Sequence, residues 1–113
     1  MGGGRSSPGF GEGGGGVSEP VCELLRLKLW VHSLQPAVTA ELMEDEVLFV
    51  ERHTDVSDPA IRMVRLRRAD GELVGTLADQ LVRLLACMEH GFTYVAQVIT
   101  INDGDVQVLV RRP

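Results

Sequence analysis

The chain has 113 residues, of which 24% are charged, and it carries a formal net charge of −5 at pH 7. This length leaves room for one domain. The longest apolar runs, such as residues 47–50, are far too short to cross a bilayer, and the N-terminal segment lacks the apolar stretch of a signal peptide. We therefore expect no membrane segment, and the acidic charge argues against non-specific polyanion binding by the whole surface.

Glycine dominates the N-terminal segment. Nine of the 13 glycines fall within residues 1–16, which hold almost no aliphatic side chains. Such a segment cannot bury enough apolar surface to offset the entropy that is lost on ordering. We expect residues 1–19 to form a disordered Gly/Ser-rich tail and residues 20–113 to form a single folded domain.

The first expected strand covers residues 25–32. Apolar side chains alternate there with polar or aromatic ones, which is typical of a half-buried strand. Residues 18–25 also fit a short helix capped by Ser18, in which case the strand begins later. A second extended stretch is expected over residues 39–51, as a hairpin or a bent strand, with Phe49 in the core.

Two Asp-Gly pairs mark hairpins in the second half of the chain. Residues 61–68 are expected to form a strand whose apolar positions change phase, as at a β-bulge. The pair at residues 70–71 predicts a two-residue turn into a short strand over residues 72–75. The pair at residues 103–104 predicts a second turn, between the last two strands, within residues 92–111.

A helix is expected over residues 77–90. Its apolar side chains follow helical spacing, and Gly91 supplies the left-handed residue at which a helix often ends. Thr76 and Asp79 have the spacing of a capping box, in which the hydroxyl and the carboxylate accept hydrogen bonds from backbone N–H groups of the first turn. With hairpins on both sides, this helix predicts an α+β fold: a small antiparallel, partly open β-barrel-like sheet with one main α-helix, preceded by the disordered tail.

Reactive residue types are scattered along the chain. The three histidines are far apart, and neither cysteine belongs to a Cys-x-x-Cys pair, so no metal site is expected. No serine lies in a glycine-flanked elbow, and no glycine-rich loop fits a phosphate. We therefore expect a protein that is not an enzyme, with no catalytic residue, no cofactor and no small-molecule substrate.

The two cysteines, Cys22 and Cys87, are too few for a disulfide framework. We expect both thiols to be free, as in a reducing intracellular compartment. Cys87 falls among leucines of the expected helix and should be an inert core residue, whereas Cys22 is a candidate for exposure.

Charge is distributed unevenly. Residues 41–58 carry seven acidic side chains against one basic side chain, and residues 62–68 carry four arginines and no acid. One interpretation is that two solvated strand faces pair across a hairpin. The other is that the arginines form a basic stripe used for binding.

The only tryptophan, Trp30, shares a strand face with Arg26, Lys28 and His32. An aromatic ring flanked by cations is what a base-stacking platform requires. The same pattern fits an amphipathic tryptophan covered by the stems of Arg and Lys. Both interpretations stay open from the sequence.

Residues 47–99 contain five motifs that together resemble the HIRAN domain, which is known from helicase-like transcription factors and related DNA-repair ATPases. Residues 47–52 (Val-Leu-Phe-Val-Glu-Arg) are similar to its apolar strand with a charged end. Residues 58–62 (Asp-Pro-Ala-Ile-Arg) are similar to its loop motif. Residues 70–77 (Asp-Gly-Glu-Leu-Val-Gly-Thr-Leu) are similar to its Val-Gly-His/Tyr-Leu strand. Residues 88–91 and 95–99 resemble the end of its helix and the following strand.

The resemblance implies a barrel-like module that binds a single-stranded DNA end inside the cell, in the nucleus rather than the cytoplasm. Asp58 matches a residue of the family's DNA pocket, and Thr76 occupies the position of its His or Tyr. We add Trp30 and Arg62 as candidate nucleic-acid contacts.

The sequence also departs from this family. The family's pocket tyrosine falls at Ser57, and its early aromatic pair falls near residues 37–38, where neither residue is aromatic. The alternative is therefore a protein-interaction module of the same fold that has lost nucleic-acid binding. The oligomeric state is not predicted.

Overall fold

The computed structural model describes residues 19–54, 56–58 and 62–113. The tail that we expect over residues 1–19 lies outside this part, apart from Glu19. No helix among the described residues is both long and apolar enough to cross a membrane. The elements follow in the order α1 (Glu19–Glu23), β1 (Leu27–Trp30), α2 (Pro36–Thr39), β2 (Val47–Thr54), β3 (Arg62–Arg67), β4 (Leu73–Leu77), α3 (Leu81–Glu89), β5 (Val95–Asn102) and β6 (Asp105–Arg111).

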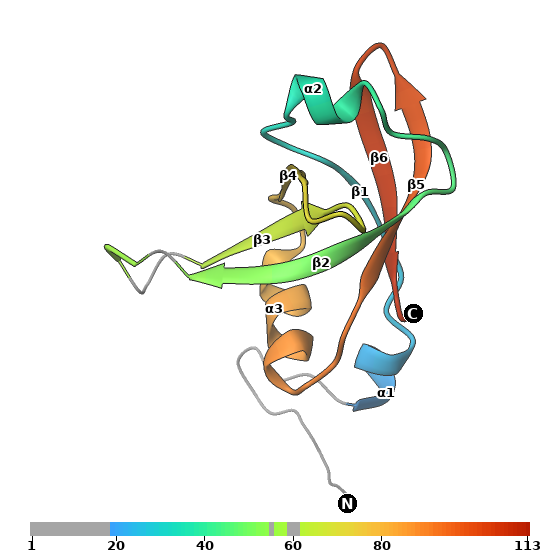
Figure 1. The fold of residues 1–113 in the computed structure, drawn as a ribbon. Helices are drawn as coiled ribbons and strands as arrows, with labels where there is room; N and C mark the ends of the chain where they lie inside the picture. Colours follow the sequence, from blue (N-terminus) through green and yellow to red (C-terminus); the bar gives the residue numbers. More distant parts are fainter. Residues whose placement is uncertain (1–18, 55, 59–61) are drawn as a thin grey trace, which may run out of the picture.

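All of these strands belong to one antiparallel sheet, in the order β1-β6-β5-β2-β3-β4. The sheet curves until its two edges meet (Figure 1). His32, just after β1, and Thr76 of β4 exchange two backbone hydrogen bonds of 2.8 Å. The Gln35 amide also donates to the Val74 carbonyl at 3.0 Å. We call this junction the seam, and the half-barrel that it joins confirms the predicted α+β class with a curved antiparallel sheet.

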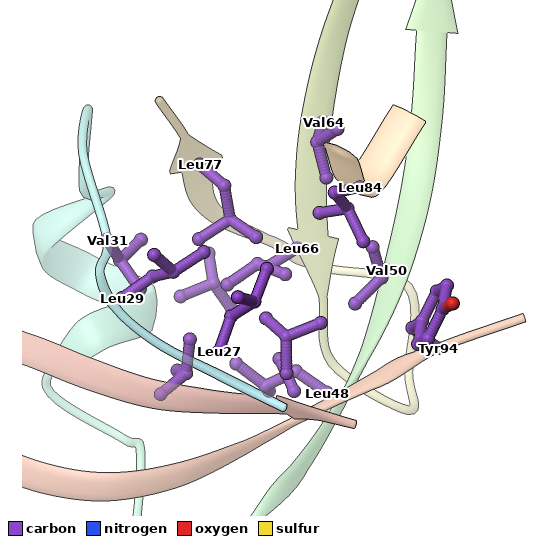
Figure 2. Close-up of a cluster of buried hydrophobic side chains, with 14 of the residues drawn as sticks. Leu27, Leu29, Val31, Leu48, Val50, Val64, Leu66, Leu77, Leu84 and Tyr94 are labelled. Atoms are coloured by element: carbon purple, nitrogen blue, oxygen red, sulfur yellow. The ribbon is translucent and has the colours of Figure 1, made fainter. Parts of the chain in front are cut away.

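Alternate residues of β1, β2 and β3 point into the interior of the half-barrel (Figure 2), and buried residues of β4, β5 and β6 complete the core. On β1 and its extension, the apolar side chains of residues 25–31 are buried and the intervening ones are exposed, so the predicted alternation is confirmed. From α3, Leu84 and Cys87 are fully buried against this interior. The short helix that we considered before the first strand also forms, as α1.

The predicted two-residue turn at residues 103–104 is confirmed. At residues 70–71 a hairpin also forms, but its loop has three residues, 69–71, because the Arg68 amide donates to the Glu72 carbonyl at 2.9 Å. Gly71, between β3 and β4, has φ of 92°. Asp103 and Gly104, between β5 and β6, have φ of 51° and 87°. Two-residue hairpin turns of this kind need positive φ at their central residues, which glycine and aspartate accept more readily than other residues. Gly91, with φ of 97°, follows α3 as predicted.

The predicted start of the helix is wrong. α3 begins at Leu81, and Thr76 and Leu77 belong to β4. The residue before the helix is Gln80, which has a left-handed backbone and makes no side-chain capping bond. Thr76 is held in the seam by its backbone pairing with His32, and its hydroxyl lies 3.4 Å from the His32 carbonyl oxygen. The capping box therefore does not form, because sheet pairing takes the residue that would have capped the helix.

The extended stretch over residues 39–51 is also only partly correct. Its first residue, Thr39, ends helix α2, where its buried hydroxyl donates to the Gln35 carbonyl at 2.9 Å. The strand begins later, at Val47, and Phe49 points outward with 53% of its surface exposed. A bulge is present in the β3–β4 pairing, but at Leu66/Arg67 rather than at the phase change that the sequence indicates near Met63.

The expectation of two free thiols is wrong: Cys22 of α1 and Cys87 of α3 form a disulfide bond. Cys22 is only 1% exposed and Cys87 is fully buried. The phenolic hydroxyl of Tyr94 donates to the Cys22 carbonyl at 2.7 Å, which gives α1 a second attachment to the domain besides the disulfide. Burial raises the pKa of Tyr94, so this hydroxyl remains a donor through the neutral range.

Candidate nucleic-acid interface

The outer face of the half-barrel carries side chains that belong to two rows across the sheet. Paired residues in a sheet share a face. The first row joins Lys28 of β1, Leu109 of β6, Gln97 of β5 and Val47 of β2. Trp30 lies two residues beyond Lys28 on the same strand, in the next row and opposite Gln107, so both point outward, and Trp30 is 45% exposed. The predicted placement of Trp30 beside a cation on one strand face is confirmed.

The second row contains an aromatic residue that sequence analysis placed in the core. Phe49 lies between Arg67 of β3 and Val95 of β5, and Val95 pairs in turn with Arg111 of β6. Its neighbours Leu48 and Val50 point into the core. Residues 47–50 are all apolar, so the sequence there gives no alternation to tell the inner from the outer face. Only strand register places Phe49 outside, with an arginine directly opposite it.

Each of these two rows contains one cation without a carboxylate partner. The guanidiniums of Arg65 and Arg67 both contact Glu51, at 3.0 Å and 3.1 Å. Burial raises the pKa of Glu51, but hydrogen bonds from Arg67 and Arg65 outweigh that effect and hold it below its usual value. Within the described part of the chain, neither Lys28 nor Arg111 has an ion-pair partner.

One neutral polar side chain, that of Gln97, links this group to an acid. Arg111 Nε donates to the Gln97 side-chain oxygen at 3.3 Å, and Gln97 Nε2 donates to Asp45 at 3.3 Å. Asp45 and Glu51 are therefore the acids in contact with this group of side chains. Four cations against two carboxylates make this group of side chains basic on a chain whose net charge is −5. We call Lys28, Trp30, Phe49, Arg67 and Arg111, which share the outer face, the outer platform; β6 and β5 separate Trp30 of β1 from Phe49 of β2.

Arginines of residues 62–68 are ion-paired throughout, which supports the interpretation of charge pairing across a hairpin. Besides the Glu51 contacts, Arg68 binds Glu46 at 2.8 Å and Glu41 at 3.1 Å. The hydrogen bond from Arg68 to Glu46 raises the pKa of the guanidinium further. Arg62 instead pairs with Glu89 of α3. These contacts leave the stripe largely neutralised by the acids of residues 41–51 and by the helix.

The four site residues predicted from sequence do not form one cluster. Trp30 and Thr76 both lie on the outer face. Thr76 pairs with His32, which lies two residues after Trp30 and points to the same side, and it also pairs with Arg65 of β3. Arg62 lies on the opposite face of β3, where it lines a pocket of 330 Å³ with Arg52 and Glu89. Asp58 is exposed in the connection between β2 and β3, at a projecting end of the sheet (Figure 1).

Within residues 19–54, 56–58 and 62–113, no three His, Cys, Asp or Glu side chains are close enough together to hold a metal ion. The side chains of the outer platform offer two aromatic faces, two cations without carboxylate partners and neutral hydrogen-bonding groups. Such a set can stack flat rings and attract negative charge.

Comparison with known proteins identifies a similar fold. No family model matches the chain, and no curated protein matches its sequence. The half-barrel is similar to the crystal structure of a protein from Lactobacillus plantarum determined by a structural genomics consortium, with a TM-score of 0.62 and 12% sequence identity. The match covers 76% of this chain and 91% of the other. At this identity the likeness shows a shared fold.

Proposed function

We propose that this chain is a non-enzymatic binding module for single-stranded DNA that acts inside the cell, in the nucleus. The proposal follows the resemblance to the HIRAN domain. It is carried by one observation: Trp30 and Phe49 are each about half exposed on one face of the sheet, with Lys28 beside the first and Arg67 opposite the second. Base stacking on exposed aromatics tolerates any sequence, and nearby cations attract the phosphates.

A single strand suits the outer platform better than a duplex does. Bases in a duplex stack on one another, whereas unpaired bases can turn their flat faces to protein aromatics. The number of cations on the platform sets how steeply the binding constant should fall as salt is added. Each neutralised phosphate of a single strand contributes a slope of about −0.7 in log K against log salt concentration. Lys28 and Arg111 alone predict about −1.4, and about −2.8 if Arg65 and Arg67 also contact phosphates.

Replacing either aromatic residue should weaken DNA binding. Trp30→Ala and Phe49→Ala are each expected to lose about 1–3 kcal/mol of binding free energy, because one stacked base loses its platform. The measurement is fluorescence anisotropy of a short labelled single-stranded oligonucleotide at two salt concentrations. Val82→Ala, an exposed apolar truncation on α3, is the matched control and should bind like the unmodified protein. Equal affinity for all four proteins would remove the outer platform as the binding surface.

Asp58 carries the proposed preference for a strand end. A carboxylate can accept a hydrogen bond from a terminal hydroxyl but repels a terminal phosphate at similar distance. We expect an oligonucleotide with a 3′ hydroxyl to bind more tightly than the same strand with a 3′ phosphate, and Asp58→Ala to abolish the difference. If the unmodified protein binds both strands equally, the proposal of end recognition is wrong, even if Trp30→Ala still weakens binding.

The second candidate is a protein-interaction module of the same fold, without nucleic-acid binding. The observation that favours it is the neutralisation of residues 62–68 by Glu41, Glu46, Glu51 and Glu89. No binding of single-stranded DNA at about 50 mM salt, where phosphate contacts are strong, would select this candidate.

A further inference from the structure

A groove lies between α1 and α3, and it includes neither the paired arginine stripe nor any member of the outer platform. Its volume is 380 Å³, and its lining includes Val21 of α1, Leu24 just after α1, Arg26 and Arg83. Leu24 is 78% exposed and Val21 is 46% exposed. Isolated exposed apolar side chains are common, but adjacent ones that line a concave surface mark interaction sites.

The groove is held in shape by covalent and polar contacts beneath it. The Cys22–Cys87 disulfide joins the two helices, and Cys22 lies in sequence between the exposed apolar residues Val21 and Leu24. Arg83 lies one helical turn before Cys87, so it faces α1. The Tyr94 hydroxyl holds the Cys22 carbonyl at 2.7 Å. A partner would therefore meet a pre-formed surface, which lowers the entropy cost of binding.

Both cations of the groove lack an acidic partner. In the described residues, neither Arg26 nor Arg83 lies within ion-pair distance of a carboxylate, although most arginines elsewhere in the domain are paired. Two guanidiniums beside Leu24 and Val21 complement a segment that carries carboxylates next to apolar side chains. Arginine suits this role because its planar fork binds carboxylates through two parallel hydrogen bonds.

We propose that the groove docks an acidic, apolar peptide segment of a partner protein, with its apolar side chains on Leu24 and Val21 and its carboxylates on Arg26 and Arg83. The site is independent of the proposed DNA binding. A chain with both sites would connect a nucleic-acid strand on one face to a protein partner on another.

The test uses the full chain and a fluorescein-labelled synthetic peptide, Asp-Glu-Leu-Leu-Asp-Leu-Leu-Glu. We expect saturable binding that weakens with added salt. Leu24→Ser and Arg83→Gln should each lower the affinity about five- to tenfold, because one removes apolar contact and the other removes a charged donor. Both residues are exposed, so neither change should affect folding.

Three controls make the result specific. Val56→Ser, at an exposed apolar residue in the connection between β2 and β3, should bind the peptide like the unmodified protein. Trp30→Ala should leave peptide binding intact, which separates this site from the outer platform. A peptide with Asn and Gln in place of its acids should bind at least about fivefold more weakly than the acidic peptide.

Three results would overturn the proposal. The first is the absence of saturable binding by the unmodified protein. The second is equal affinity of the unmodified protein, Leu24→Ser and Arg83→Gln. The third is a concentration-dependent dimer, seen by sedimentation, that Leu24→Ser dissociates, since the groove would then be occupied by a second copy of the chain.

Discussion

Removing the disulfide, by the double change Cys22→Ala and Cys87→Ala, should lower the free energy of unfolding by about 4 kcal/mol. The two cysteines are separated by 65 residues in sequence. In the chain-entropy account, a cross-link that closes a loop of this length restricts the unfolded ensemble by about 4 kcal/mol. The effect is large, because a domain of about 90 residues is typically stable by roughly 5–14 kcal/mol.

Urea unfolding with and without a reductant measures this effect. The unmodified protein should unfold at a lower urea concentration when reduced, and the double variant should be insensitive to the reductant. A variant that is as stable as the oxidised protein would show that the cross-link contributes nothing. Counting thiols under denaturing, non-reducing conditions provides the direct control, since two reactive thiols would contradict the bond itself.

The disulfide also affects the proposed location of the protein. Disulfides persist in oxidising compartments, whereas the nucleus keeps thiols reduced. In the nucleus, the chain would rely on the Tyr94 hydrogen bond and on apolar packing to hold α1. We therefore expect DNA binding, which depends on the outer platform, to survive reduction, because none of its residues belongs to α1 or α3.

Gly75→Ala should destabilise the domain by about 3 kcal/mol, at the upper end of the ~1–3 kcal/mol typical of overpacking. A Cβ atom at this position would lie 2.6 Å from the His32 carbonyl oxygen and 2.7 Å from Val31 Cγ1. The first of these atoms is backbone and belongs to the seam, so it cannot move without disturbing the bonds between His32 and Thr76. The change should therefore open the half-barrel where its edges meet.

Hydrogen exchange separates this local effect from a general loss of stability. We expect the amides of His32, Gln35 and Thr76 to lose protection before those of the β5–β6 pair. Gly71→Ala is the matched control. An added Cβ at Gly71 would have no atom within 4 Å, so Gly71→Ala loses stability only because of the φ of 92° at this position. The amides of the seam should therefore stay protected in this variant. Equal exchange at the seam in both variants would mean that Gly75 does not govern closure.

The residues that sequence analysis assigned correctly are those whose neighbours in the chain determine their state. Alternation over residues 25–31 fixed the buried and exposed faces of the first strand, because side chains of a strand point to opposite faces in turn. The two-residue turn at Asp103 and Gly104 formed because few other residues accept positive φ. Trp30 was placed on the outer face for the same local reason.

The tertiary structure decided what depends on partners distant in sequence. Thr76 looked like a helix cap until its pairing with His32, 44 residues away, placed it in a strand. Cys22 and Cys87 became a disulfide because the fold brings α1 to α3. Phe49 became a surface residue because its register with Arg67 and Val95 set the face of an otherwise uniformly apolar run. The sequence by itself therefore determined local conformation and fold class, whereas the outer platform and the α1–α3 groove exist only through long-range pairing, which local patterns do not encode.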